Sequence, residues 1–318
     1  MCTAIAFSGK FPMLGRTLDV EGSFGEEIIV YRANSAPSKE SNDKFILGVG
    51  IVRDGEPLFF DAVSSRGLAG AGLNLPYFTS YGRGSEGARN IASHSVIREV
   101  LSACDSVSEA REYFRDAVII DETHSSGLNA TPLHWIFADK DSSIVIESVG
   151  GVLTVYDNEW GALANAPTFD FHNLNIRKYA PLSRGSITSD GDFLTGSSYT
   201  RGLGALGLPG DLSSPSRFIR AGFFSWATLQ ETSRCGEISR LIHLLDNVAV
   251  PRGSVLTEEG RALETVYTVC YDLSEQICYF KTYNGHSLYA VSLSDYMDSA
   301  LPLRIPISHK FSPHFITP

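Results

Sequence analysis

The chain begins Met1-Cys2-Thr3-Ala4-Ile5-Ala6-Phe7, and this stretch decides how the rest of the sequence is interpreted. Aminopeptidases remove an initiator methionine when a small residue follows it. The new first residue, Cys2, would then carry both a thiol and a free α-amine, so the thiol would have a base of its own. Most chains that begin Met-Cys make no use of this arrangement, so other residues must support it.

Composition favours one compact soluble domain. The chain has 318 residues, 43% of them hydrophobic, and the sequence contains no linker, repeat or low-complexity tract, so we expect a single domain over residues 1–318. The formal net charge is −10, and the charged residues are interspersed. Since nucleic acid binding needs a basic patch, we expect no nucleic acid partner.

No targeting segment is evident in the sequence. The start has no basic stretch followed by a long apolar one, and no run approaches the ~20 apolar residues of a spanning helix. If Cys2 is the mature N-terminus, no signal peptide can precede it. We therefore expect a cytoplasmic protein with no propeptide and no membrane insertion.

The five cysteines fit neither a disulfide framework nor a zinc site, because their number is odd and their spacing irregular. Apart from Cys2, they stand in apolar settings typical of small buried residues. The eight histidines are scattered, and His134, His172 and His243 are interpreted as structural. A Cys–His pair stays open as an alternative, although no local pattern supports one. We expect no metal and no cofactor.

Short β-rich runs separated by turn residues predict strands in two blocks. The predicted strands are Cys2–Ser8, Glu27–Arg32, Phe45–Val52, Leu58–Val63, Gly67–Leu73, Leu133–Ala138, Ser143–Val149, Gly151–Tyr156, Gly161–Ala164, Glu264–Tyr271, Gln276–Thr282 and Ser287–Val291. Blocks of strands around central helices indicate an α+β fold of stacked sheets flanked by helical layers.

Apolar periodicity and capping patterns predict four helices. They cover roughly Ala88–Ser102, a segment from Ser106 with a capping box, Ser216–Gln230 and Glu237–Val248. The segment Lys178–Asp211 is rich in Gly, Ser and Thr and poorly periodic. We expect it to be an extended excursion or an assembly arm, because so long an irregular segment usually has a function.

Gly82-Arg83-Gly84-Ser85-Glu86-Gly87 matches the dinucleotide-binding fingerprint. That fingerprint also needs a buried strand before it and an acidic residue ~20 positions later. Here a proline interrupts the preceding stretch, and Asp121 lies too far along. A surface loop is the better interpretation, with a dinucleotide-dependent oxidoreductase as the alternative from another class.

Several polar residues could support a nucleophilic Cys2. An ionised Asp19 beside the terminal amine would orient it, and Arg16 beside the sulfur would stabilise a thiolate, although the two could instead form a surface ion pair. Asn74 and Asn165 each end a predicted strand, where they could make turns or donate to an oxyanion. Arg217 stands in the first turn of an apolar helix, which is unusual for a solvated side chain.

Taken together, five ordered motifs resemble the choloylglycine hydrolases, the bile salt hydrolase and penicillin V acylase family of the N-terminal-nucleophile superfamily. The motifs are Met1-Cys2-Thr3, Gly15-Arg16-x-x-Asp19, Ala71-Gly72-Leu73-Asn74, Asn165-x-Pro167-Thr168-Phe169-Asp170, and Gly207-Leu208-Pro209-Gly210-Asp211 followed by Ser216-Arg217-Phe218. The resemblance runs along nearly the whole chain. It implies a four-layer αββα sandwich, a homotetramer, and an assembly arm over Lys178–Asp211.

The resemblance also assigns roles position by position. Cys2 matches the nucleophile, Arg16 the arginine that contacts its sulfur, and Asp19 the aspartate that binds the terminal amine. Asn74 and Asn165 match the oxyanion hole. Arg217 matches a supporting active-site arginine.

Substrate choice depends largely on Asn74, since penicillin V acylases of the family usually carry tyrosine there and bile salt hydrolases asparagine. Leu18, Phe24 and Phe60 match pocket positions and would form an apolar wall. The resemblance therefore implies hydrolysis of glycine- or taurine-conjugated bile salts, small amphipathic anions. Penicillin V, or another N-acyl amide such as an acyl-homoserine lactone, is the alternative substrate. A non-enzymatic binding sandwich is the remaining alternative.

Overall fold

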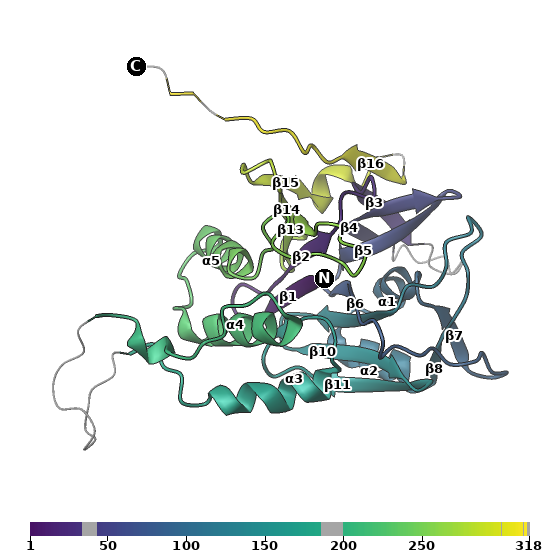
Figure 1. Ribbon diagram of the computed structural model, residues 1–318. Coiled ribbons are helices and arrows are strands. Elements are labelled where there is room, and N and C mark those ends of the chain that lie inside the picture. Colours follow the sequence, from purple (N-terminus) through teal and green to yellow (C-terminus); the bar gives the residue numbers. More distant parts are fainter. Residues whose placement is uncertain (34–42, 186–199, 300, 314, 317–318) are drawn as a thin grey trace.

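The computed structural model describes residues 1–33, 43–185, 200–299, 301–313 and 315–316. Two antiparallel sheets form its centre (Figure 1). The first has the order β12 (Ala162–Leu163), β1 (Cys2–Phe7), β2 (Met13–Val20), β13 (Glu264–Asp272), β14 (Ile277–Thr282) and β15 (Tyr289–Ser292). The second has the order β11 (Val152–Asp157), β10 (Ser143–Val149), β9 (Leu133–Ala138), β6 (Ala69–Asn74), β5 (Glu56–Ser64), β4 (Lys44–Arg53), β3 (Glu27–Ala33) and β16 (Leu303–Pro306).

Helices cover the outer face of each sheet. The first sheet packs against α4 (Ser214–Ala227) and α5 (Arg234–Asp246), with α3 (Phe169–Asn175) beside α4. The second packs against α1 (Val96–Ala103) and α2 (Val107–Arg115). Short 3-10 turns complete the chain at η1 (Ile176–Tyr179), η2 (Leu203–Ala205) and η3 (Leu293–Tyr296). The predicted α+β sandwich with four layers is confirmed.

This layering explains the sequence pattern of the central strands. In β1 and β2 nearly every residue is buried, because one face of the sheet meets the other sheet and the opposite face meets the helices. Strands buried on both faces give near-continuous apolar runs instead of alternation. The polar residues inside these runs, such as Arg16 and Asp19, therefore need buried partners.

Two strands contain bulges close to one another in space. Between β4 and β5 the register shifts so that Val49 pairs with Asp61 and Gly50 with Phe59, which leaves Phe60 unpaired. A side chain at Gly50 would collide with the Leu58 carbonyl oxygen at 2.3 Å, so only glycine allows this close approach. The second bulge lies in β13 between Thr265 and Tyr267. Bulges of this kind redirect side chains near functional sites.

The helix predicted over Ala88–Ser102 is wrong in its first half. Residues Arg89–Ala92 form strand β7, which pairs in parallel with β8 (Ala117–Ile120), and α1 starts only at Val96. The strands β2, β8 and β16 and the helix α3 were not predicted. In β2 the polar residues Arg16 and Asp19 interrupt the apolar pattern by which a strand is predicted. The residues that contact them lie in other elements, so a local sequence window does not explain their burial. The predicted helix start at Ser106 is confirmed, since the Ser106 hydroxyl accepts from the Glu109 N–H at the start of α2. The Glu109 carboxylate accepts from the Asp105 N–H at 2.8 Å and not from that of Ser106, so the reciprocal half of the capping box is shifted by one residue.

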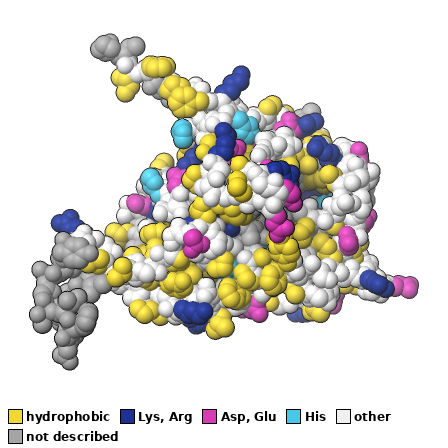
Figure 2. Space-filling model, viewed as in Figure 1, with side chains coloured by type: hydrophobic (Ala, Val, Ile, Leu, Met, Phe, Trp, Pro, Cys, Tyr) yellow, Lys and Arg dark blue, Asp and Glu magenta, His cyan; other side chains and the backbone are white. Residues whose placement is uncertain are grey.

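The proposed arm, Lys178–Asp211, lies partly outside the described residues, which omit 186–199. Its described ends include the last two residues of η1 and all of η2. Among the described residues, no helix is long and apolar enough to cross a membrane. Acidic and basic side chains are mixed over the face shown in Figure 2.

Candidate active site

Cys2 starts strand β1 in the interior of the molecule. Its exposed fraction is 4%, and it lies opposite Leu18 in the β1–β2 ladder. Figure 1 shows the N-terminus in the middle of the fold. The Met1 amine donates to the Asp19 main-chain oxygen, and the Asp19 N–H donates to the Met1 oxygen at 2.9 Å. The chain start is thus held within the first sheet.

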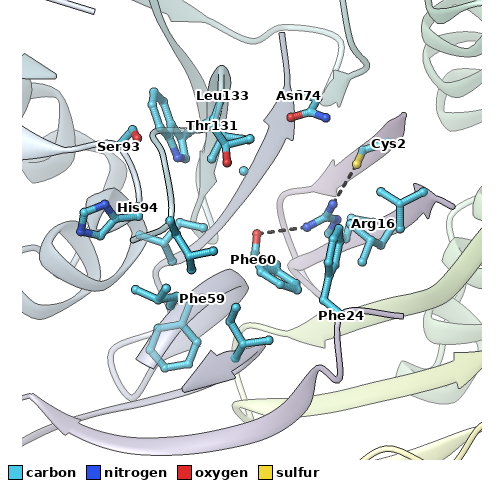
Figure 3. Close-up of a pocket in the computed structure, with 18 of the residues that line it drawn as sticks. Cys2, Arg16, Phe24, Phe59, Phe60, Asn74, Ser93, His94, Thr131 and Leu133 are labelled. Atoms are coloured by element: carbon cyan, nitrogen blue, oxygen red, sulfur yellow. Dashed lines mark hydrogen bonds between the residues drawn. The ribbon is translucent and has the colours of Figure 1, made fainter. Parts of the chain in front are cut away.

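Arg16 reaches the cysteine sulfur from the neighbouring strand. Its Nη2 donates to Cys2 Sγ at 2.9 Å, and its Nη1 donates to the Phe60 carbonyl at 3.1 Å (Figure 3). The same Nη1 also donates to Asp61 Oδ2 at 3.0 Å. The side chain is 1% exposed, which excludes the surface ion pair with Asp19 considered above. Burial alone would lower the pKa of Arg16, but Tyr267, Cys2 and Asp61 outweigh it and raise that pKa.

Asp61 anchors this arginine from the second sheet. Oδ2 also accepts from the Tyr267 hydroxyl at 2.5 Å, and Oδ1 accepts from the Tyr271 hydroxyl at 2.6 Å. Burial raises the pKa of Asp61, and Arg16 and the two tyrosines oppose that shift. Burial and the nearby carboxylate raise the pKa of both tyrosines well above the ordinary range, so both hydroxyls remain donors.

Asp19 lies beside the chain start, fully buried. Its carboxylate accepts from the Thr265 hydroxyl at 2.6 Å and from the Thr17 hydroxyl at 3.1 Å. Burial raises the pKa of Asp19, and the positive charge of Arg217 is the main opposing influence. The bulge in β13 places Thr265 against Asp19 and Tyr267 against Asp61.

Asn165 follows β12 and contacts the Cys2 backbone. Its Oδ1 accepts from the Cys2 N–H at 2.7 Å, and its Nδ2 donates to the Asn74 main-chain oxygen at 2.7 Å. The Asn165 backbone is fixed in turn: its N–H donates to Ser214 Oγ, and its oxygen accepts from Ser214 Oγ and contacts His172 Nε2, all at 2.8 Å. The amide group therefore has a single orientation.

Arg217 lies on the other side of Cys2, in the first turn of α4. Nη1 donates to the Cys2 oxygen at 2.5 Å and to the Thr3 hydroxyl, and Nη2 donates to Asn165 Oδ1 at 2.7 Å. Nε donates to the Leu212 oxygen at 3.1 Å. Because these acceptors are neutral, burial dominates and lowers the pKa of Arg217.

Two buried histidines support the strand end that carries Asn165. His134 contacts Glu147 and the Ala164 oxygen, both at 2.8 Å. His172 stacks on Phe218 with ring centroids 4.7 Å apart, and burial lowers its pKa to about 4. Neither ring lines the cavity at Cys2.

Cys2 opens into an apolar cavity of about 260 Å³. The predicted pocket residues Leu18, Phe24 and Phe60 all line it, together with Asn74. Phe24 and Phe60 meet edge to face with their ring centroids 5.7 Å apart. Figure 3 places Cys2, Arg16 and Asn74 at one end of this cavity.

The other end of the cavity is polar. Ser93 and His94 lie there, away from Cys2 in Figure 3. The His94 ring meets the His124 ring edge to face at 5.0 Å, and burial together with His124 lowers the pKa of His94. His124 belongs to the loop Asp121–Asn129, and Leu128 and Asn129 of the same loop also line the cavity.

The six predicted catalytic residues thus gather around Cys2. Cys2, Arg16 and Asn74 line the cavity, while Asp19, Asn165 and Arg217 lie behind the cysteine backbone. Sequence reasoning missed the contributions of Asp61, Thr265, Tyr267, Tyr271, Ser214 and His172. The one available signal was a single carboxylate in the apolar run Leu58-Phe59-Phe60-Asp61-Ala62-Val63.

The alternative dinucleotide site is not supported by its surroundings. The Gly82–Gly87 loop leads into strand β7, not into a helix, and the segment before it is irregular. Among the residues that the structure describes, no three His, Cys, Asp or Glu side chains are placed to share a metal ion.

Comparison with protein families gives a match over most of the chain. A model described as linear amide C–N hydrolases, choloylglycine hydrolase family, matches residues 2–302. The bile salt hydrolase/transferase of Lactiplantibacillus plantarum is 34% identical, with 96% of this chain and 97% of the relative covered. The bile salt hydrolase/transferase of Clostridium perfringens is 35% identical, with 92% and 93% covered.

Solved structures agree with these matches. The C2A mutant of conjugated bile acid hydrolase from Clostridium perfringens aligns over the whole of both chains, with a TM-score of 0.91 and 32% identity. The penicillin V acylase of Agrobacterium tumefaciens covers 92% of this chain and 86% of its own, with a TM-score of 0.71 and 18% identity. At that identity the second match shows the shared fold alone.

Proposed function

The chain belongs to the choloylglycine hydrolase family of linear amide C–N hydrolases, and on that premise we propose that it hydrolyses the amide bond of glycine- or taurine-conjugated bile salts with Cys2 as nucleophile. The observation that carries the proposal is the contact between Arg16 Nη2 and Cys2 Sγ at 2.9 Å, at one end of an apolar cavity. A buried guanidinium beside sulfur favours the thiolate, which is the nucleophilic form.

The proposed reaction starts after removal of Met1. The Cys2 α-amine takes the proton of the Cys2 thiol, and the thiolate attacks the carbonyl carbon of the substrate amide. Asn165 Oδ1, which accepts from the Cys2 N–H at 2.7 Å, would hold this amine near the sulfur, and Asp19 matches the position that binds the terminal amine in the family. The negative charge on the carbonyl oxygen is stabilised by the Asn74 and Asn165 amides, and one such donor is typically worth about 3 kcal/mol of barrier.

Collapse of the tetrahedral intermediate completes the first half of the reaction. The C–N bond breaks, the protonated α-amine gives its proton to the departing glycine or taurine nitrogen, and a thioester with Cys2 remains. Water then attacks the thioester while the same amine accepts the water proton. The bile acid leaves, and the thiol is restored.

The acyl group is assigned from the cavity and from the relatives. The apolar walls with Leu18, Phe24 and Phe60 suit a rigid hydrocarbon such as a steroid nucleus. Two relatives more than 30% identical over most of the chain are named bile salt hydrolase/transferase. Asn74, rather than tyrosine, lies beside Cys2 at the end of the cavity where the amide would sit.

A direct test compares three substrates on one sample. Glycocholate, taurocholate and penicillin V are offered to the purified protein, and released amino acid or side-chain acid is quantified. We expect turnover of at least one conjugated bile salt to exceed that of penicillin V at least tenfold. Faster turnover of penicillin V would overturn the assignment of the acyl group and leave the mechanism standing.

The nucleophile is tested on the same sample by mass spectrometry and substitution. The intact mass should correspond to loss of Met1, and Cys2→Ala should abolish hydrolysis while its melting temperature stays close to that of the wild type. Cys235→Ala is the matched control, because Cys235 is an exposed free thiol outside the cavity. Full activity in a sample that retains Met1 would contradict the mechanism.

We further propose that the enzyme is a homotetramer in the cytoplasm. Large apolar side chains are exposed around α3, η2 and α4, including Leu174, Leu206 and Trp226, which fits an assembly surface. The five free thiols fit a reducing compartment. Light scattering measures the assembly, where a monomer would contradict the proposal, and cell fractionation measures the location.

A further inference from the structure

We propose that Asp61 is a positioning residue for this reaction: it holds the Arg16 guanidinium on the Cys2 sulfur and offsets its positive charge. The Cys2 sulfur then accepts a hydrogen bond from an arginine whose positive charge is already paired with Asp61. The role in turnover rests on the proposed function. The effect on the reactivity of the sulfur does not, and it can be measured without any substrate.

The two terminal nitrogens of the Arg16 guanidinium have different acceptors. Nη1 is held by two acceptors of β5, the Phe60 carbonyl and Asp61 Oδ2, at 3.1 and 3.0 Å. Nη2 is thereby left to point at Cys2 Sγ at 2.9 Å. Since a guanidinium is planar, fixing Nη1 on two sides fixes the direction in which Nη2 points.

Asp61 is held in turn by hydrogen bonds from two tyrosines. Tyr267 and Tyr271 donate to separate carboxylate oxygens, at 2.5 and 2.6 Å, and the Tyr271 hydroxyl accepts from the Val49 N–H at 3.2 Å. The carboxylate, the guanidinium and both phenol rings are buried between the two sheets. A buried charge pair with its remaining acceptor positions filled keeps one geometry.

The bulge in β5 places both acceptors next to Arg16. The bulge in β5 leaves Phe60 without a ladder partner, so its carbonyl is free to accept from Arg16. The same bulge directs Asp61 toward β13 across the space between the sheets. In a regular antiparallel ladder a main-chain carbonyl lies in the plane of the sheet and faces the neighbouring strand, so the bulge lets the Phe60 carbonyl and the Asp61 side chain accept from the same guanidinium nitrogen.

The consequence concerns charge at the sulfur. Cys2 faces the cations Arg16 and Arg217, and Asp61 faces Arg16, Tyr267, Tyr271 and Cys278. Tyr267 also faces Glu26. Removing the Asp61 charge alone leaves Arg16 uncompensated, so the sulfur should lose its proton at lower pH. Because a thiolate that forms more easily is a weaker nucleophile, turnover should fall.

The test is alkylation of Cys2 by iodoacetamide as a function of pH, in a Cys235→Ala background and read from the Cys2 peptide by mass spectrometry. Asp61→Asn keeps the size and one acceptor and removes the charge. We expect its alkylation midpoint to move down by roughly one pH unit, the size of effect of a single nearby charge. We expect kcat on glycocholate to fall about threefold, since nucleophilicity falls with thiol pKa at a Brønsted slope of about 0.4–0.5, and we expect KM to stay close to that of the background protein.

The matched control is Asp272→Asn. Asp272 is a fully buried carboxylate at the far end of β13 that pairs with Arg234 instead. Asp272→Asn should leave the alkylation midpoint unchanged and kcat close to that of the background protein. If Asp61 only fills space, the isosteric Asp61→Asn leaves the alkylation midpoint unchanged, and an unchanged or raised midpoint would overturn the proposal.

A second variant covers the case in which Asp61→Asn does not fold. Tyr267→Phe removes one donor from the carboxylate and leaves its charge less shielded, so the midpoint should rise by a few tenths of a pH unit. A lower or unchanged midpoint contradicts the proposal. If the wild type cleaves no bile salt, the proposed function fails, and the alkylation shifts still decide the role of Asp61.

Discussion

The two sides of Cys2 carry the same residue in opposite electrostatic settings. Arg16 and Arg217 are both almost fully buried, and both contact the cysteine, one at the sulfur and one at the backbone oxygen. Arg16 pairs with Asp61 at 3.0 Å, and its pKa is raised. Arg217 is held by neutral oxygens, no carboxylate forms an ion pair with it among the described residues, and its pKa is lowered.

This difference separates two uses of a buried cation. On the Arg16 side the charge is balanced in place, so the arginine serves as a directed donor to sulfur. On the Arg217 side the charge acts at longer range on Asp19 and on the cysteine. Stability should therefore depend on the two arginines unequally, although we expect both to be needed for activity.

The largest effect is expected from Arg16→Met, which leaves the Asp61 carboxylate buried and unpaired. Removing one partner of a buried ion pair typically costs about 3–5 kcal/mol of unfolding free energy. Urea denaturation of the variant and the wild type measures this loss. A loss below about 1 kcal/mol would show that Asp61 takes up a proton at no cost, and the contrast between the two sides would disappear.

The loss of folding stability in acid should come mainly from His172, which contacts Asn165 on the Arg217 side of Cys2. An unfolded histidine titrates near pH 6.5, whereas the folded pKa of His172 is about 4. Between these values the unfolded state binds more protons, so His172 stabilises the fold fully above pH 6.5, and the contribution is lost as the pH falls to 4. The loss should be about 3 kcal/mol.

Urea denaturation of the wild type and His172→Gln between pH 4 and 7 measures that loss as a difference in slope. The glutamine amide can still donate to the Asn165 oxygen. The raised pKa values of Asp19 and Asp61 act in the opposite direction in both proteins, so they cancel in the comparison. If the free energy of unfolding falls equally with decreasing pH in the two proteins, His172 is not the cause of the acid sensitivity.

A smaller effect on stability is expected from Arg217→Met. The acceptors left behind are neutral, so the loss should be about 1–3 kcal/mol, less than for Arg16→Met. Activity should be lost in both variants. The measurement is again urea denaturation. A loss equal to or above that of Arg16→Met would mean that the longer-range attraction between Arg217 and Asp19 stabilises the fold as much as the Arg16–Asp61 ion pair.

The smallest net change is expected from the double variant Arg16→Met with Asp61→Asn. The asparagine oxygen can still accept from a tyrosine, and no unpaired charge remains inside. We expect stability to return to within about 1 kcal/mol of the wild type, with no recovery of activity. A double variant as unstable as Arg16→Met alone would assign the loss to packing instead of charge.

Much of the fold could be predicted because local patterns and the resemblance agreed. The strands Leu133–Ala138 and Ser143–Val149 have the predicted bounds, since turn residues flank each apolar run. Strand β2 was missed because Arg16 and Asp19 interrupt its pattern. The helix predicted from Ala88 was wrong at its start, because pairing with Ala117–Ile120 lies outside what a local window contains.

The residues of the site divide in the same way, into those with a local sequence pattern and those defined only by long-range contacts. Residues with reactive or charged groups near recognisable turns, such as Cys2 and Asn165, could be proposed from sequence. Asp61, Tyr267 and Tyr271 could not, because they belong to ordinary apolar strands and meet only when the two sheets stack. Their partners are 45 to 210 residues away along the chain.

The bulge at Phe60 bears on how this cavity could be redesigned. The Phe60 side chain lines the cavity, whereas the Phe60 carbonyl, not its side chain, holds Arg16. Every residue type carries that carbonyl. A saturation library at position 60 could therefore reshape the binding space and preserve the contact with the arginine, while one at position 61 would mostly yield inactive clones. Directed evolution of substrate preference has a natural starting position there.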